Sequence, residues 1–212
     1  MLLALDTSSP QVSVALARDA DVLDEAASEQ TMKHGEQLAP MVAALLERTG
    51  TDRGELTAIA AGVGPGPFTG LRVGLVTART LGHVLGIPVY GVCSLDVLAA
   101  EAVLTGDVAE DFVVATDARR REVYWARYGP RAERLTDPAV DRPLDVDWAG
   151  PVVGEGASLY PATFPLGLAP ERPSAGWLAR LVAEERATLL EPEPMYLRRP
   201  DAVAPGKPKS VS

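Results

Sequence analysis

Gly62-Val63-Gly64-Pro65-Gly66-Pro67-Phe68-Thr69-Gly70-Leu71-Arg72 is the stretch of this 212-residue chain that decides its predicted fold. The apolar run from residue 59 to residue 63 is typical of a strand buried on both faces, and the glycines and prolines behind it end any strand pairing. Thr69 is placed to cap a helix, which Gly86 and Pro88 would end. The stretch therefore predicts a buried strand, a rigid turn and a long helix in direct succession.

Small residues repeat every four positions along this helix. They are Gly70, Gly74, Ala78 and Gly82. Since each glycine costs a helix roughly 1 kcal/mol relative to alanine, we expect a close neighbour to make up the loss. That neighbour is either a strand or helix of the same domain or another subunit, and the sequence leaves both alternatives open.

The turn lacks the features of a phosphate-binding loop. A Walker loop has a lysine directly after its last glycine, where this chain has Leu71. The glycine spacing of a dinucleotide-binding fingerprint is also absent. The sequence therefore gives no nucleotide fingerprint at this turn.

Composition places the chain among soluble, globular, cytoplasmic proteins. Hydrophobic residues make up 47% of it, which provides a sizeable core, and no apolar run approaches the roughly 20 residues that span a bilayer. The formal charge of -9 disfavours binding of nucleic acid by the chain alone unless basic groups gather on one face. The single cysteine, Cys93, follows an apolar strand, and we expect it to be buried and unreactive.

Residues 1–108 predict a complete α/β unit. Strands are expected at Leu2–Asp6, Gln11–Ala17, Val22–Ala27, Ile59–Val63 and Val89–Val92, and helices at 35–48, 69–85 and 94–103. The order βββαβαβα is typical of a mixed sheet covered by helices. Residues 109–200 predict a second unit with paired strands at Phe112–Thr116 and Val123–Arg127 and a helix over 174–190, and residues 201–212 predict a disordered tail.

Residues 64–74 resemble the GxGPGSFTGLRVG signature of the bacterial TsaB (YeaZ) family, with Pro67 in place of the usual serine. Four further segments carry the resemblance. They are Leu5-Asp6-Thr7-Ser8, residues 117–124, Gly154-Glu155-Gly156-Ala157 and Pro194-Met195-Tyr196-Leu197-Arg198. The family implies an α/β fold of the actin/Hsp70/sugar-kinase (ASKHA) type with two βββαβαβα halves, the second of them reduced.

The resemblance also implies a function. Members of the family are non-catalytic partners in the formation of N6-threonylcarbamoyladenosine at position 37 of tRNAs that read codons beginning with A. The implied partners are the related catalytic subunit TsaD, the ATPase TsaE and a second copy of the chain, with tRNA bound only within the complex. A small ATPase or sugar-kinase-like enzyme on the same fold is the alternative.

The fold type also implies where nucleotide would bind. The positions are Asp6, Thr7 and Ser8 in a first turn, Asp117 in a second, and Gly154 and Gly156 in a third. Ordinary turns are the alternative for each, because Asp, Ser and Gly favour turns for local reasons. We expect no cofactor beyond weak ATP or ADP at a partner interface.

Arg119, Arg120 and Arg121 crowd the second turn, which in active relatives is rich in glycine. They are either a solvated hairpin tip or a contact for tRNA phosphates or for an acidic partner.

Ser94 and Leu98 occupy the positions of two metal-binding histidines in the catalytic relative. Leucine cannot coordinate a metal and serine does so poorly, so we expect neither a metal site nor catalytic residues. His34 and His83 lie on different predicted helices without carboxylates at metal-binding spacing. A glycoprotease would need a nucleophile and base pair, and neither Cys93 nor Ser94 has a histidine nearby in sequence.

The helix over 69–85 and the helix over 35–48 are predicted to form the surface that meets the catalytic relative, or a second copy of the chain. The residues assigned to this surface are Leu38, Met41, Leu45, Thr69, Gly70, Arg72, Gly74, Ala78 and Gly82. Because the two proteins would share a fold, the contact is expected to be pseudo-symmetric.

Overall fold

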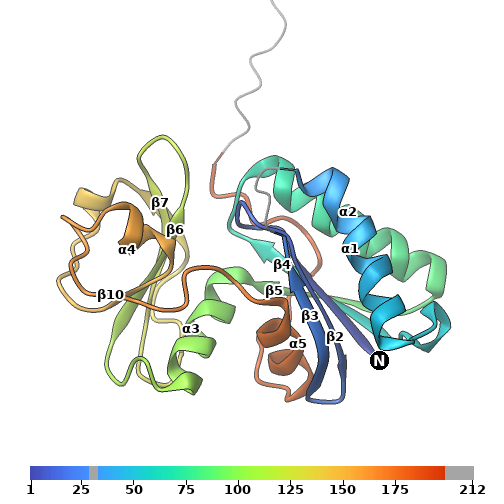
Figure 1. The fold of residues 1–212 in the computed structure, drawn as a ribbon. Helices are drawn as coiled ribbons and strands as arrows, with labels where there is room; N and C mark the ends of the chain where they lie inside the picture. Colours follow the sequence, from blue (N-terminus) through green and yellow to red (C-terminus); the bar gives the residue numbers. More distant parts are fainter. Residues whose placement is uncertain (29–32, 199–212) are drawn as a thin grey trace, which may run out of the picture.

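The structure is a computed structural model that describes residues 1–28 and 33–198, and it contains two five-stranded sheets with helices packed on them (Figure 1). The first half contains β1 (Leu2–Asp6), β2 (Ser13–Arg18), β3 (Asp21–Ala27), α1 (His34–Thr49), η1 (Arg53–Glu55), β4 (Ala58–Gly64), α2 (Phe68–Leu85), β5 (Val89–Cys93) and α3 (Ser94–Thr105). Its strand order is β3-β2-β1-β4-β5, with β1 to β3 antiparallel and β1, β4 and β5 parallel. This is the predicted βββαβαβα unit, and the α/β fold class is confirmed.

The second half is smaller, as predicted. It contains β6 (Phe112–Asp117), β7 (Val123–Tyr128), β8 (Ala139–Asp141), η2 (Pro143–Asp145), β9 (Val152–Val153), α4 (Glu155–Leu159) and β10 (Gly167–Leu168) in the strand order β10-β9-β6-β7-β8, followed by α5 (Ala175–Ala183). Two of these strands have two residues and α4 has five, so the half is reduced relative to the first.

Helix α5 follows the second half in sequence but packs on the first sheet. Its residues Leu178 and Ala179 lie in one core cluster with Leu2, Ala4 and Ala15. It also ends at Ala183 rather than at the predicted residue 190. The predicted division into 1–108 and 109–200 is therefore incomplete, because the chain returns to the first half after β10. The predicted tail over 201–212 lies outside the described residues.

Alternation along β1 explains why helices cover both faces of the first sheet. Leu3 and Leu5 point to the face covered by α1 and α2, whereas Leu2 and Ala4 point to the face covered by α5. Figure 1 shows α1 and α2 on one side of β1 to β4 and α5 on the other. Burial on both faces accounts for the almost continuous apolar sequence of β1.

The row of small residues on α2 faces the chain's own first sheet. A Cβ added to Gly70 would lie 2.5 Å from the Thr7 carbonyl oxygen, and one added to Gly82 would lie 2.3 Å from a methyl of Val89. Ala78 is fully buried, and Gly74 has its neighbours in Leu5 and Thr7 of β1 and its turn. The prediction that these four positions contact a partner is wrong, because the chain itself covers them.

Two further predictions around α2 need correction. Leu38 and Leu45 of α1 belong to the core beneath the helix pair and are 1% and 0% exposed, so they do not form an outer surface either. The helix begins at Phe68 behind Pro67, without a side-chain cap, so Thr69 is its second residue and not its cap. The end is as predicted, because Gly86 adopts the left-handed conformation with φ of 67°.

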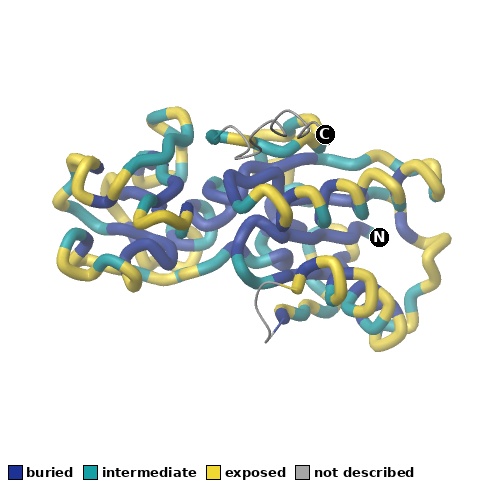
Figure 2. The backbone as a smooth tube through the Cα atoms, turned by 90° about the horizontal axis from the view of Figure 1, so that it is seen from above, coloured by how far each residue is buried: buried dark blue, intermediate teal, exposed yellow. Residues whose placement is uncertain are grey.

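One hydrophobic core runs through the junction of the two halves. Leu95 and Leu98 of α3 pack with Phe112 and Val114 of β6 and with Tyr128 of β7. Figure 2 shows buried backbone continuing from one half into the other. The halves therefore share a core and are not joined by a free linker.

Replacing Gly74 by alanine is expected to destabilise the fold by about 1 to 3 kcal/mol, because the new Cβ would lie 2.2 Å from the Thr7 hydroxyl. Gly35→Ala is the matched control on α1, since its Cβ would meet only Val73 at 4.0 Å, and its stability should stay unchanged or rise by up to about 1 kcal/mol. Urea unfolding of both variants measures the difference. Equal stabilities for the two variants would contradict the packing described for α2.

Candidate functional site

The candidate site lies where β1 ends and the first residues of α2 and α3 come together. Asp6, the last residue of β1, is 2% exposed. Its Oδ1 accepts hydrogen bonds from the Ser8 amide at 2.7 Å and the Ser8 hydroxyl at 2.6 Å, and its Oδ2 accepts one from the Ser94 hydroxyl at 2.6 Å. Both carboxylate oxygens are thus engaged by the chain itself.

Burial raises the pKa of the Asp6 carboxyl above its ordinary value. The hydrogen bonds from Ser8 and Ser94 and the charge of His34 act in the opposite direction and keep the rise smaller. Three short hydrogen bonds from uncharged donors stabilise the carboxylate form in this position. Because both carboxylate oxygens of Asp6 already accept hydrogen bonds from the chain, the arrangement is typical of a structural contact and not of a site that binds a metal or a phosphate.

The other residues of the first turn also bond inward. The Thr7 hydroxyl donates to the Gly70 carbonyl of α2 at 2.8 Å, and His34 Nε2 lies 2.8 Å from the Ser9 carbonyl. Thr7 and Ser8 are 0% and 7% exposed. Thr7 therefore holds α2, and Ser9 holds α1, against the end of β1. Nucleotide binding by Asp6, Thr7 and Ser8 stays a prediction.

Ser94 stands where the catalytic relative is expected to have a metal-binding histidine, and in this chain it has a structural role. Besides donating to Asp6, its Oγ accepts a hydrogen bond from the Gly64 amide at 3.3 Å. A Cβ at Gly62 would lie 1.8 Å from Asp6 Oδ2 and 2.8 Å from Ser94 Oγ, which explains the glycine there. Leu98, at the other replaced position, is fully buried in the core between the halves.

Asp117 ends β6 and organises the second turn. Its Oδ1 accepts a hydrogen bond from the Arg119 amide at 2.8 Å, and its Oδ2 lies 3.2 Å from the Arg119 guanidinium. Arg119, Arg120 and Arg121 are exposed and have φ of 61°, 55° and 63°. On the next strand, the Tyr124 hydroxyl donates to the Gly66 carbonyl at 3.4 Å, which brings this hairpin beside the loop that precedes α2.

Gly154 and Gly156 of the third turn are explained by packing. A Cβ at these positions would lie 2.3 Å and 2.8 Å from the Ala115 carbonyl oxygen of β6. Gly154 also has φ of 104°, which residues with a side chain rarely adopt. The start of α4 therefore needs glycine in order to sit on its own sheet, whether or not a nucleotide binds there.

Cys93, at the end of β5, is fully buried. Burial, and then the charge of Asp96, raise the pKa of the Cys93 thiol to about 12. The thiol is therefore protonated at neutral pH, which a nucleophilic cysteine must avoid. Ser94 directs its hydroxyl proton to Asp6, so neither residue is prepared as the nucleophile of a protease.

A second polar cluster links the two halves through Asp96 of α3. Its carboxylate accepts a hydrogen bond from the Tyr128 hydroxyl at 2.7 Å and two from Arg134 Nη1 at 3.1 and 3.2 Å. Burial raises the pKa of the Asp96 carboxyl, while Tyr128 and Arg134 act to lower it. Sequence analysis did not identify this cluster, because its members are 32 and 38 residues apart.

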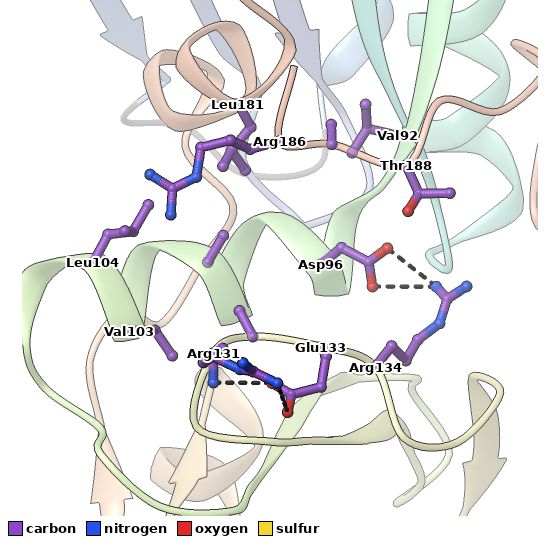
Figure 3. Close-up of a pocket in the computed structure, with 13 residues that line it drawn as sticks. Val92, Asp96, Val103, Leu104, Arg131, Glu133, Arg134, Leu181, Arg186 and Thr188 are labelled. Atoms are coloured by element: carbon purple, nitrogen blue, oxygen red, sulfur yellow. Dashed lines mark hydrogen bonds and ion pairs between the residues drawn. The ribbon is translucent and has the colours of Figure 1, made fainter. Parts of the chain in front are cut away.

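This cluster borders a pocket of about 450 Å³ between α3, the loop 131–134 and the segment 186–188 (Figure 3). Figure 3 shows Asp96 paired with Arg134 at one end of the pocket and Arg131 paired with Glu133 below it. The predicted nucleotide-binding residues do not line this pocket. It is a polar hollow between the halves, separate from the three turns.

A third polar group lies beside α5. Glu25 of β3 accepts a hydrogen bond at 2.8 Å from the hydroxyl of Ser174, the residue that caps α5. Glu25 and Glu101 of α3 both line a pocket of about 440 Å³. Burial, followed by the charges of Glu25 and Asp107, raises the pKa of Glu101 to about 7, and a hydrogen bond from Trp177 acts in the opposite direction. The Glu101 carboxyl therefore changes its protonation near neutral pH.

No helix within residues 1–28 and 33–198 combines the length and the apolar character that crossing a membrane requires.

Comparisons with known proteins agree with the fold. The family model described as TsaD, tRNA N6-adenosine threonylcarbamoyltransferase, matches residues 21–162. The chain is 44% identical over 206 residues to an uncharacterized protein of Mycobacterium tuberculosis, covering 95% of this chain and 93% of that protein. It is 33% identical over 174 residues to the tRNA threonylcarbamoyladenosine biosynthesis protein TsaB of Escherichia coli, covering 76% of this chain and 73% of that protein. The solved structure of YeaZ from Pseudomonas aeruginosa superposes with a TM-score of 0.75 at 33% identity, over 92% of this chain and 99% of that chain.

The stability of the folded chain is expected to fall as pH rises from about 4.5 to about 7, because folded Glu101 holds its proton more tightly than unfolded Glu101 does. Glu101→Gln keeps an acceptor for Trp177 and removes the charge. It should raise the free energy of unfolding at pH 8 by roughly 1 to 2 kcal/mol, once solvent screening of this half-buried group is included, and leave it unchanged near pH 4. Urea unfolding at both pH values measures this, with the exposed Glu47→Gln as control. An equal gain at both pH values would refute the assignment to Glu101.

Proposed function

The chain belongs to the TsaB (YeaZ) family, and from this premise we propose that it is a non-catalytic subunit of the complex that forms N6-threonylcarbamoyladenosine on tRNA. The observation that supports this most is the closed state of the first turn. Ser8 and Ser94 donate hydrogen bonds to both oxygens of Asp6. The carboxylate that an active relative would use for nucleotide and metal therefore stabilises the fold in this chain.

Three further features support a non-catalytic role. Ser94 bonds to Asp6 and Leu98 is in the core, so neither side chain is available as a metal ligand. The Cys93 thiol, with its pKa of about 12, is a poor nucleophile. The three arginines in the second turn occupy the place where active relatives bring backbone amides close to phosphate.

We propose TsaD as the direct partner, with TsaE and tRNA joining through the complex. The match of the TsaD family model to residues 21–162 supports a shared fold, and a shared fold allows a pseudo-symmetric contact that a second copy of the chain can also make. Weak ATP or ADP binding would then need the partner to complete the pocket. The complex would act in the cytoplasm, where tRNA is modified.

The contact is proposed on the outward faces of α1 and α2 instead of on the buried small residues. Thr69 and Arg72 are exposed on α2 and Met41 is partly exposed on α1, so these three predicted residues remain candidates. Val76 and Val84, which are 61% and 72% exposed, add apolar surface on α2. Exposed aliphatic side chains on one helix are the kind of surface that a subunit contact would cover.

Val76→Glu is expected to weaken binding to TsaD from the same cell, and self-association, by at least about tenfold, because a charge would be buried in the contact. Leu144→Glu is the matched control, since Leu144 is 84% exposed on η2 in the other half. Size-exclusion chromatography and formation of the modified nucleoside in the reconstituted complex measure the effect, with melting temperatures as a check on folding. Wild-type binding by Val76→Glu would rule out this face, and the absence of any complex with the wild-type chain would refute the proposed function.

A further inference from the structure

The turn between β6 and β7 carries three exposed arginines in an uncommon conformation. Arg119, Arg120 and Arg121 all have φ between 55° and 63°, the left-handed region that costs free energy for residues with a Cβ. Glycine or asparagine would adopt this conformation more readily. The backbone conformation therefore does not favour arginine at these three positions, and we look for the reason in the interactions of the side chains.

The turn is held in place by specific contacts. The Ala118 amide donates to the Glu122 carbonyl at 3.0 Å, and the Glu122 amide donates to the Arg119 carbonyl at 3.0 Å. From the C-terminal segment, Arg198 donates to the Ala118 carbonyl at 2.7 Å and forms an ion pair with Glu122. The arginines are therefore presented by a built hairpin tip and not by a frayed loop.

The charge of this tip contrasts with that of the chain. Arg119, Arg120, Arg121 and Arg198 bring four positive charges together on a chain with a net charge of -9, and Asp117 and Glu122 form ion pairs with two of them. The C-terminal segment also contacts α2, where Arg72 lies over the Phe68 ring at 4.1 Å and Phe68 stacks on Tyr196 at 5.0 Å. In Figure 1 the hairpin tip above β7 and the C-terminal segment lie at the same end of the molecule.

We propose that this arginine turn, residues 119–121 with Arg198, contacts the phosphodiester backbone of the tRNA within the complex. The inference rests on the proposed function and extends it to the RNA-facing surface of this subunit. Guanidinium groups match phosphate geometry with paired N–H donors, and such contacts position a nucleic acid without reading its sequence. The negative charge of the remaining chain explains why the contact would work only when the complex supplies further basic surface.

An acidic protein partner fits the turn less well than RNA does. Between Asp117 and Glu122 the one apolar residue is Ala118, which is 2% exposed. Protein interfaces have an apolar centre surrounded by charge, and this tip offers charge without such a centre. A phosphate backbone needs only the charge and the donors.

Arg120→Gly with Arg121→Gly tests the proposal without endangering the fold, because glycine suits the left-handed backbone at both positions. Binding of unmodified tRNA to the reconstituted complex is measured by fluorescence anisotropy over a series of salt concentrations. The double variant should lower the tRNA affinity about tenfold or more and reduce the slope of log K against log salt by about 1 to 2. Its melting temperature and its assembly with TsaD should stay at or above those of the wild-type chain.

Arg18→Gln with Arg53→Gln is the matched control. It also removes two exposed positive charges, but at the end of the first sheet opposite Asp6, where Ala17 pairs with Leu2. This control should leave the affinity and the salt slope unchanged. Equal tRNA binding by the glycine variant and the wild-type chain, or equal losses in the glycine variant and the control, would overturn the proposal. Loss of assembly with the partner protein in the glycine variant would overturn it in favour of a protein contact, whereas failure of the wild-type chain to assemble would refute the proposed function itself.

Discussion

The buried carboxylate of Asp6 is the interaction on which the remaining structure depends most. It draws hydrogen bonds from Ser8 in its own turn and from Ser94 at the start of α3, and Ser94 in turn receives the Gly64 amide from the end of β4. A buried charge without such partners would cost far more than the hydrogen bonds return, so the three segments must meet at this point. The glycine at position 62 follows directly, since any side chain there would occupy the space of the carboxylate.

The same constraint connects the fold with the function. Helix α2 begins directly behind this junction and lies so close to β1 and β5 that only glycine and alanine fit beneath it. The inner face of α2 is covered by its own sheet, whereas Val76 and Val84 on its outer face are exposed. The shared core between the halves, together with the Asp96, Tyr128 and Arg134 cluster, fixes the second half against the first. The junction between the halves is therefore filled by core packing and by this polar cluster.

Much of the fold could be predicted from the sequence because local patterns determine it. The apolar run of β1, the alternation of β2 and the glycine that ends α2 each depend on neighbouring residues. The row of small residues on α2 shows the limit of prediction from sequence. Small residues indicate that a neighbour approaches closely, but they do not indicate whether that neighbour belongs to the same chain. The return of α5 to the first sheet and the pairing of Asp96 with Arg134 depend on contacts far apart in sequence, and the burial of Asp6 depends on Ser94, 88 residues away. Sequence spacing carries no signal for such pairs.

A calorimetric titration of the isolated chain with ATP and Mg²⁺ tests the central claim that the Asp6 turn serves the fold and not a ligand. If Ser8 and Ser94 occupy this carboxylate, no binding heat should appear up to millimolar nucleotide, and addition of TsaD should be needed before any nucleotide is retained. Micromolar binding by the chain alone, lost in Asp6→Asn at unchanged melting temperature, would contradict the claim.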